Sequence, residues 1–166
     1  MCKPLEDGNY FYNNVVFAGS FDHLHEGHKH ILRTAFRIGK RVGIGLTTDS
    51  MLYYKEQRNL IQSFPMRLEV LEDFIRTECG QNRCAIFPID TKEGGADKME
   101  DLEALIISDE ITVVQNAFEI NQLRINNGLK RFHIVIVPMV RTPDGRPLSS
   151  SRIRAGETYD PKTLIY

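Results

Sequence analysis

Two features that mark membrane and nucleic-acid proteins are missing from this sequence of 166 residues. The formal net charge is only −1, whereas a general binder of nucleic acid or of an anionic membrane needs a surplus of Lys and Arg on its surface. No apolar stretch approaches the roughly 20 residues of a membrane span, and Met1 to Asn14 lacks the apolar core of a signal peptide. We therefore expect a cytoplasmic protein with no nucleic-acid partner and no membrane partner.

Cysteine is also scarce. The chain has Cys2, Cys79 and Cys84 and no CxxC pair. An odd, scattered count favours unpaired thiols in a reducing compartment, although a Cys79–Cys84 bridge stays open. Repeats, low-complexity tracts and linkers rich in Pro, Gly and Ser are absent too, so we expect one domain, which at this length buries about two thirds of its unfolded surface.

What the sequence does have is an alternation of short apolar runs and amphipathic stretches. The apolar runs predict buried strands at 15–18, 41–46, 85–88, 105–108 and 132–137. Helical spacing and end signals predict helices at 28–38, 49–54, from Pro65 onward, 114–127 and from 149–151. Asp49 is the expected cap of the second of these. The helix after Pro65 is expected to bury Met66, Leu68, Val70, Leu71, Phe74 and Ile75. Polar residues 89–101 predict a loop with a short helix.

This alternation predicts a fold class and a place for the site. Unbroken apolar strands separated by helices indicate a parallel sheet covered on both faces, which gives a doubly wound, five-stranded, Rossmann-like α/β domain. Ligands bind such sheets at the carboxyl ends of the strands, near the point where the strand order reverses. The stretch GSFDHLHEGH, residues 19–28, follows the strand at 15–18 directly. We therefore expect the site there.

The histidines of this stretch do not fit a metal or acyl-transfer site. His25-Glu26-Gly27-His28 is one residue shorter than the helical zinc motif HExxH and contains a glycine, and no Cys lies nearby. No GxSxG elbow supports a covalent nucleophile. An isolated histidine is most often a solvated polar residue, and His23, His30 and His133 are interpreted in that way.

A phosphate cradle explains more of these residues together. A helix that begins near Glu26 leaves its first N–H groups unpaired and directs a partial positive charge toward the strand ends. Gly27 would let a ligand lie against that first turn, and His25 and His28, three residues apart, can face the same ligand. The turn before them adds a close backbone approach at Gly19 and a hydroxyl donor at Ser20.

A second stretch, Leu148 to Arg154, points to the same chemistry. It offers three hydroxyls at a helix start, from Ser149, Ser150 and Ser151, and Arg154 lies three residues after Ser151 on the same side. Hydroxyls, free amides and a guanidinium together make a polyphosphate clamp. Alone, the stretch is explained equally well as a helix cap followed by surface arginines. The two stretches in one parallel sheet predict a nucleotide enzyme.

Both stretches resemble signatures of the nucleotidyltransferase superfamily. Residues 19–28 resemble (T/S)xxHxGH, and residues 148–154 resemble ISSTxxR with Leu for Ile and Ser for Thr. Within the superfamily the chain is most similar to the archaeal-type phosphopantetheine adenylyltransferases, through segments such as PIDTKEGGADKMEDLEALIIS and INQLRINNGL. The resemblance covers roughly residues 13–158, so we expect a nucleotidyltransferase domain there, with terminal extensions at 1–12 and 159–166.

The resemblance implies transfer of AMP from ATP to 4′-phosphopantetheine, which gives dephospho-coenzyme A, the precursor of coenzyme A, and pyrophosphate. A phosphate oxygen attacks and is already ionised at neutral pH, so the reaction needs alignment and charge neutralisation rather than a general base. By resemblance, His28 would contact the α-phosphate in the transition state, and Ser20 the phosphate that joins both substrates. The nucleotide site would also include Gly19, Phe21, His25 and Gly27, with Ser149, Ser150, Ser151 and Arg154 on the β- and γ-phosphates.

Other assignments are looser. The family's lysine after the second strand matches Lys55 best, with Arg58 in reserve, and either would also contact the acceptor. Mg²⁺ would be held mainly by ATP phosphates and water, without a cage of protein ligands. Asp22 is the one acid to watch there, although capping of the following turn is its favoured role. For the oligomeric state, the expectation leans to a monomer.

Three alternatives stay open from sequence. A nicotinamide-mononucleotide adenylyltransferase usually opens with an RGRFQP-like stretch, from which GSFDHL departs. A glycerol-phosphate-type cytidylyltransferase shares the opening, so only the middle segments argue against it. A non-catalytic nucleotide-binding module should have lost a histidine or the serine stretch, and this sequence keeps both.

Overall fold

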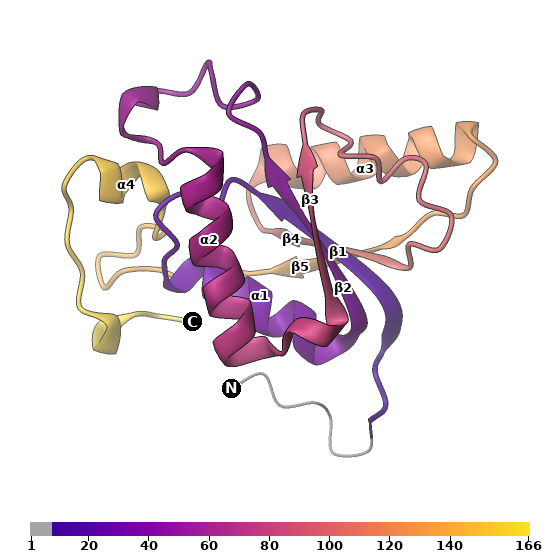
Figure 1. Cartoon of the computed structure of the whole chain (residues 1–166), viewed down its shortest axis with the longest axis horizontal. Helices are drawn as coiled ribbons and strands as arrows, with labels where there is room; N and C mark the ends of the chain where they lie inside the picture. Colours follow the sequence, from indigo (N-terminus) through magenta and orange to yellow (C-terminus); the bar gives the residue numbers. More distant parts are fainter. Residues whose placement is uncertain (1–7) are drawn as a thin grey trace.

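A computed structural model describes residues 8–166, and its centre is a five-stranded parallel sheet (Figure 1). The strands are β1 (Tyr12–Gly19), β2 (Gly39–Thr47), β3 (Cys84–Ile89), β4 (Ala104–Ser108) and β5 (His133–Val137). Their order is β3-β2-β1-β4-β5, and all neighbours pair in parallel. The order reverses between β1 and β4, so the carboxyl end of β1 lies at the switch point. The predicted fold class is confirmed.

Helices cover both faces of the sheet. They are α1 (Glu26–Ile38), α2 (Phe64–Phe74), α3 (Ile111–Asn126) and the short α4 (Ser150–Arg154). Helices α1 and α2 pack on one face, where Leu32, Phe36 and Leu71 are fully buried, and α3 packs on the other around Ala117 and Ile120 (Figure 1). Within residues 8–166 no helix is long and apolar enough to cross a membrane.

Two predicted short helices are not formed. Residues 49–54 make successive turns instead, and Asp49 caps none of them: its carboxylate accepts hydrogen bonds from the side chain of Arg67 and the amide of Phe64. Residues 90–101 also form turns and bends. Both segments connect strand ends to the next helix or strand at the edge of the sheet, where surface loops are the usual solution.

The buried face of α2 differs from the predicted one. Leu71 and Phe74 are buried as expected, but Met66 is 53% exposed and Val70 41%. Arg67 takes their place and is fully buried. Its guanidinium donates to the carbonyls of Ser20, Thr47 and Gln62 and to the Asp49 carboxylate, so its charge and every side of its fork have partners.

The predicted cysteine chemistry holds where the structure describes it. Cys79 and Cys84 carry thiols rather than a disulfide, and burial raises the pKa of Cys84 to about 11. Such a thiol stays protonated and unreactive at neutral pH. Cys2 lies outside the described residues.

Gly39 joins α1 directly to β2, because it is both the C-cap of the helix and the first residue of the strand. A Cβ at this position would lie 3.0 Å from Cγ1 of Val15 and 3.1 Å from the carbonyl oxygen of Ala35. Both neighbours belong to the buried core. Only glycine therefore lets the chain turn from helix to strand without a linker here.

We expect Gly39→Ala to lower the free energy of unfolding by about 1–3 kcal/mol, the scale of overpacking in a filled core. Urea unfolding monitored by circular dichroism measures it. Lys40→Ala is the matched control, because Lys40 is exposed on the same strand and should change stability by no more than about 0.5 kcal/mol. Equal stability of the two variants would show that the junction can relax.

Candidate active site

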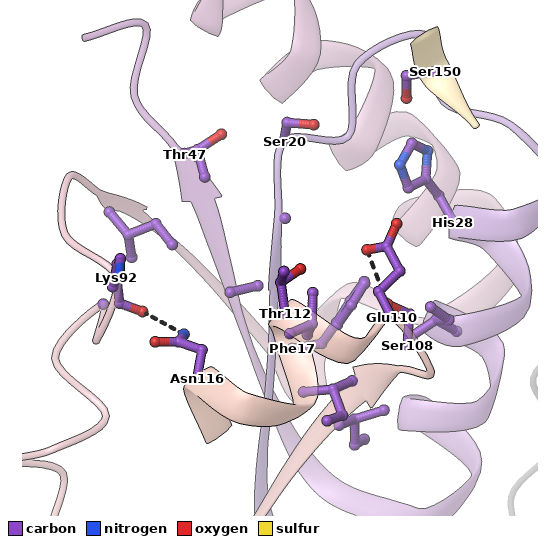
Figure 2. Close-up of a pocket in the computed structure, with 18 of the residues that line it drawn as sticks. Phe17, Ser20, His28, Thr47, Lys92, Ser108, Glu110, Thr112, Asn116 and Ser150 are labelled. Atoms are coloured by element: carbon purple, nitrogen blue, oxygen red, sulfur yellow. Dashed lines mark hydrogen bonds between the residues drawn. The ribbon is translucent and has the colours of Figure 1, made fainter. Parts of the chain in front are cut away.

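A cavity of about 850 Å³ opens at the carboxyl ends of the strands, around the switch point. Figure 2 shows His28 and Ser150 on one side, Thr47, Lys92 and Asn116 on the other, and Ser20 between them. The volume is within the range of about 300–1,000 Å³ typical of small-molecule sites. Nearly all of the site residues predicted from sequence line it: Gly19, Ser20, His25, Gly27, His28, Lys55, Ser149, Ser150, Ser151 and Arg154.

The first turn of α1 holds the two histidines in a stack. His25 is the N-cap, and its Nδ1 accepts a hydrogen bond from the Gly27 amide at 3.1 Å. His28 lies one turn along, and its Nδ1 accepts from the His25 amide at 3.4 Å. The two ring centroids are 3.9 Å apart with an interplanar angle of 22°. The two amides are therefore capped by the rings, which corrects the expectation that they are unpaired.

These contacts decide which proton each ring carries. Burial lowers the pKa of His25 to about 4, and burial, with smaller effects of the neighbouring His25 and of Lys55, lowers the pKa of His28 well below its usual value. Both rings are therefore neutral at neutral pH. Because each Nδ1 accepts from a backbone amide, each Nε2 carries the proton. The histidines supply two neutral N–H donors.

The missing side chain of Gly27 makes room for the ring of His25. A Cβ here would lie 2.9 Å from Cε1 of His25, and the Leu148 carbonyl is 3.7 Å away. The absence of a side chain thus makes room for the His25 ring as well as for the predicted ligand.

Phe21 is the predicted nucleotide residue that does not line the cavity. It is 1% exposed and has a left-handed backbone, with φ of 50°. Its ring packs edge-on against Phe17 at 5.3 Å and tilted against His28 at 5.5 Å. Phe21 therefore supports the His28 ring from beneath rather than contacting a ligand in the cavity.

The serine stretch begins α4 as expected. Ser149 is the N-cap, and its hydroxyl accepts from the Arg152 amide and lies 3.0 Å from the Ser151 hydroxyl. Ser150 donates to the carbonyl of Asp22 at 2.7 Å. This last contact joins α4 to the turn after β1, although the two segments are 128 residues apart.

Arg154 and Asp22 form a buried ion pair that the sequence did not suggest. Nη1 of Arg154 lies 2.7 Å from Oδ2 of Asp22, and the side chains are 7% and 1% exposed. The other oxygen of Asp22 accepts from the Gln62 amide at 2.8 Å. Asp22 thus does not cap the following turn, and both its carboxylate oxygens are already engaged.

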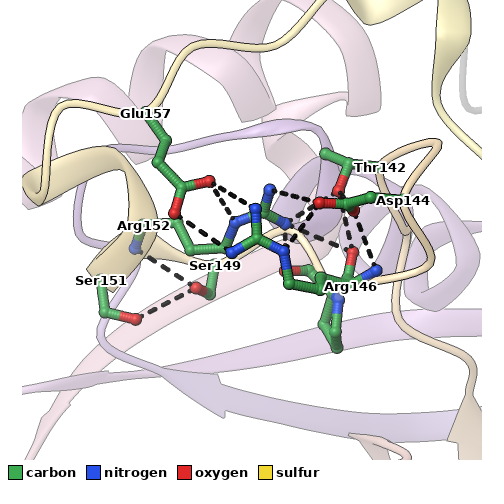
Figure 3. A network of polar contacts seen from close by, with 8 residues as sticks. Thr142, Asp144, Arg146, Ser149, Ser151, Arg152 and Glu157 are labelled. Atoms are coloured by element: carbon green, nitrogen blue, oxygen red, sulfur yellow. Dashed lines mark hydrogen bonds and ion pairs between the residues drawn. The ribbon is translucent and has the colours of Figure 1, made fainter.

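A polar network holds α4 in place from its outer side (Figure 3). Arg152 donates to the hydroxyl of Thr142 and to the carbonyl of Pro147, both at 2.9 Å, and pairs with Glu157 at 2.8 Å. Arg146 links Glu157 to Asp144, and Thr142 donates to Asp144. A helix of five residues is not stable alone, so this network determines where the serines lie.

The segment between β2 and α2 brings Lys55 to the cavity and leaves Arg58 outside. Lys55 lines the cavity and is close enough to lower the pKa of His28. Arg58 stacks over the Tyr53 ring at 4.2 Å and lines a separate, shallow pocket. Of the two cations left open by the sequence, the structure favours Lys55.

Several cavity residues were missed from the sequence. Lys92 and Glu93 follow β3, and Thr112, Asn116 and Glu119 come from the first turns of α3. The Asn116 amide donates to the Lys92 carbonyl at 3.2 Å, which joins these two walls (Figure 2). Their position just beyond β3 and β4, at the same edge as residues 19–28, was the available signal.

The other three histidines lie apart from the cavity. The ring of His23 contacts the Leu60 carbonyl, and His30 packs against Tyr166. The ring of His133 shares a hydrogen bond with the hydroxyl of Tyr12. Over the described range, no group of three His, Cys, Asp or Glu side chains is arranged to hold a metal ion.

Comparison with known proteins agrees with this geometry. The Cytidylyltransferase-like family model matches residues 16–156. A phosphopantetheine adenylyltransferase of Thermococcus kodakarensis is 42% identical over 145 residues, which cover 87% of this chain and 86% of that protein. The chain belongs to the phosphopantetheine adenylyltransferase family. A second member, from Methanopyrus kandleri, is 36% identical over 86% of this chain and 89% of its own length.

Solved structures agree with the nucleotidyltransferase fold of this adenylyltransferase family. A protein with unknown function from Archaeoglobus fulgidus superimposes with a TM-score of 0.66 at 30% identity, over 75% of this chain and 88% of that one. A bifunctional NMN adenylyltransferase/ADP ribose pyrophosphatase from Francisella tularensis gives 0.55 at 16% identity, over 87% of this chain and 41% of its own, a likeness of fold alone.

The buried His25 of this family member makes stability depend on pH. The folded chain keeps His25 neutral down to about pH 4, whereas the unfolded chain takes up a proton near pH 6.5. Since the unfolded state binds more protons in this window, the free energy of unfolding falls as pH is lowered, by up to about 1.4 kcal/mol per pH unit for one group.

We expect His25→Gln to make the free energy of unfolding less dependent on pH between pH 6.5 and pH 5, by an amount that corresponds to about one proton fewer taken up on unfolding. Urea unfolding at several pH values measures this dependence. His133→Gln is the control, because His133 is exposed on β5. An unchanged slope in His25→Gln would mean that the His25 ring is not held neutral by burial.

Proposed function

We propose that this protein transfers AMP from ATP to 4′-phosphopantetheine, which gives dephospho-coenzyme A and pyrophosphate in coenzyme A biosynthesis. One observation carries the proposal. In a chain of this family, the histidine pair at the start of α1 and the serines and arginine of α4 face one cavity at the switch point of the sheet.

The side of the cavity next to α1 and α4 suits a nucleoside triphosphate. His25 and His28 offer N–H donors on Nε2, the Ser20 and Ser151 hydroxyls are nearby, and Arg154 adds a positive charge. Phosphate oxygens are strong acceptors, and charge-assisted hydrogen bonds to them are the stronger kind. We assign His28 to the α-phosphate, and Ser149, Ser150, Ser151 and Arg154 to the β- and γ-phosphates.

The opposite side suits the acceptor. It combines the cation Lys92 with the amide of Asn116 and the hydroxyl of Thr47, and apolar strand ends also line the cavity. Lys55 lines the same cavity, close enough to His28 to lower its pKa. A phosphate with a long arm of amides and methylenes needs that combination of charge, hydrogen-bonding groups and apolar surface. We therefore assign Lys55 and Ser20 to the acceptor phosphate, where it attacks the α-phosphorus in line with the leaving pyrophosphate.

The chemistry requires no base from the protein, and neutral histidines fit this. Attack adds negative charge to the α-phosphate, and a fixed N–H donor from His28 stabilises that charge without having to give up its proton. Nucleotidyltransferases use a divalent metal with ATP, and we propose Mg²⁺ here. Asp22 has both carboxylate oxygens engaged by Arg154 and Gln62, which supports a metal held mainly by ATP phosphates and water.

Pyrophosphate release tests the function on one scale. ATP or CTP is supplied with 4′-phosphopantetheine, nicotinamide mononucleotide or glycerol 3-phosphate, each with and without Mg²⁺. We expect turnover only with ATP, 4′-phosphopantetheine and Mg²⁺ together, because a site built for amides rejects acceptors that leave its polar groups unpaired. Pantetheine without its phosphate lacks the attacking oxygen and should be inert. Comparable kcat/KM with nicotinamide mononucleotide or with CTP would reassign the substrate.

His28→Ala tests the assigned centre. Because the α-phosphate gains charge only on the way to the transition state, kcat should fall by about 10²–10³ with little change in the affinity for ATP. His30→Ala is the control: it lies on the same helix, outside the cavity, against Tyr166. Near-native turnover by His28→Ala would remove His28 from the reaction.

A further inference from the structure

We propose that Asp22 is a positioning residue, which holds Arg154 for the terminal phosphates of ATP and ties the segment carrying Lys55 to the same point. This rests on the function proposed above, because it assumes that Arg154 binds ATP. Asp22 itself does not line the cavity and would touch neither substrate.

The contacts of Asp22 join three parts of the chain. Its Oδ2 binds Arg154 of α4 at 2.7 Å, its Oδ1 accepts from the Gln62 amide at 2.8 Å, and its carbonyl accepts from Ser150 at 2.7 Å. The side chain is 1% exposed. A buried carboxylate costs several kcal/mol unless it is fully paired, and this one is paired on both oxygens.

Arg154 depends on this single acceptor. Its side chain is 7% exposed, and Asp22 is its one hydrogen-bond acceptor among residues 8–166. The buried Nε has no partner in that part of the chain. A buried N–H without an acceptor is unfavourable, and Arg154 lines the cavity. Asp22 therefore fixes the side chain of Arg154 through Nη1 and leaves the other N–H groups of the guanidinium for an anion such as the ATP phosphates.

Asp22 also holds the segment that carries Lys55. Lys55 lies in the segment 48–63, and the end of that segment is fastened to the turn after β1 by Asp22 and His23. The His23 amide donates to the Gln62 side chain at 2.9 Å, and the His23 ring contacts the Leu60 carbonyl at 3.0 Å. Loss of the Asp22 carboxylate would loosen this fastening and the ion pair with Arg154 at once.

The sign of the effect on ATP separates positioning from simple charge repulsion. If Asp22 acted only as a negative charge near the phosphates, its removal would strengthen ATP binding. If it positions Arg154, its removal leaves the guanidinium without its acceptor and weakens ATP binding. Asp22→Asn is the informative change, because one amide oxygen cannot serve both the Arg154 and the Gln62 donors.

We measure binding of ATP and of AMP by calorimetry. Asp22→Asn should weaken ATP about tenfold to a hundredfold, the scale of one charge-assisted hydrogen bond, and should weaken AMP much less, since AMP lacks the terminal phosphates. In an Arg154→Ala background the same change should weaken ATP less than about twofold, because the two residues act as one unit. Asp90→Asn is the charge control, since Asp90 is exposed just after β3 at the same edge of the sheet.

The rate of trypsin cleavage tests whether Asp22 holds the segment that carries Lys55. Asp22→Ala, which removes both carboxylate contacts, should speed cleavage after Lys55 and Arg58 at least several-fold relative to wild type. Wild-type binding of ATP, measured first, separates failure of the proposed function from failure of this inference. Given that binding, three results would each overturn the inference: tighter ATP binding by Asp22→Asn, additive losses with Arg154→Ala, or unchanged cleavage in Asp22→Ala.

Discussion

The buried guanidinium of Arg67 is the contact on which the arrangement of the site depends. From the first turn of α2 it donates to Ser20 at the end of β1, to Thr47 at the end of β2 and to Gln62 at the end of the segment that carries Lys55. Three strand and loop ends are thereby held at hydrogen-bond distance from one planar group. A lysine has no fork that could do this, so a change as conservative as Arg67→Lys would leave buried carbonyls unpaired.

The two sides of the cavity differ in the chemical groups that they supply. The α1 side is rigid: its histidines are stacked, capped on backbone amides and supported by Phe21. It supplies neutral N–H donors rather than charges, and in the proposed reaction these would stabilise the charge that grows on the α-phosphate. The positive charges come instead from Lys55, Lys92 and Arg154, on segments that are held by side-chain contacts.

The sequence was sufficient for the parts that depend on local pattern. Apolar runs predicted the five parallel strands, and the two short motifs predicted the part of the cavity wall that α1 and α4 form. The failures share a physical cause. Periodicity placed Met66 and Val70 in the core and Arg67 outside, because a buried arginine becomes favourable only through acceptors that distant loops provide. The pairing of Asp22 with Arg154 spans 132 residues and leaves no local trace, and Asp49 was assigned to a helix cap although its partner lies in α2.

The two elements assigned to phosphate binding are held in place in different ways. Helix α1 buries a full apolar face and would keep its first turn in place whatever occupies the cavity. Helix α4 has five residues and no apolar face buried in the core, so its position comes from the Arg152 network on one side and from Asp22 on the other. Bond exchange occurs at the α-phosphate and needs fixed geometry, since a misplacement of about 1 Å can cost on the order of 10² in rate. Pyrophosphate only has to be held and then released. Under the proposed assignment, the element packed on the core lies at the α-phosphate, and the element held by side-chain contacts lies at the leaving pyrophosphate.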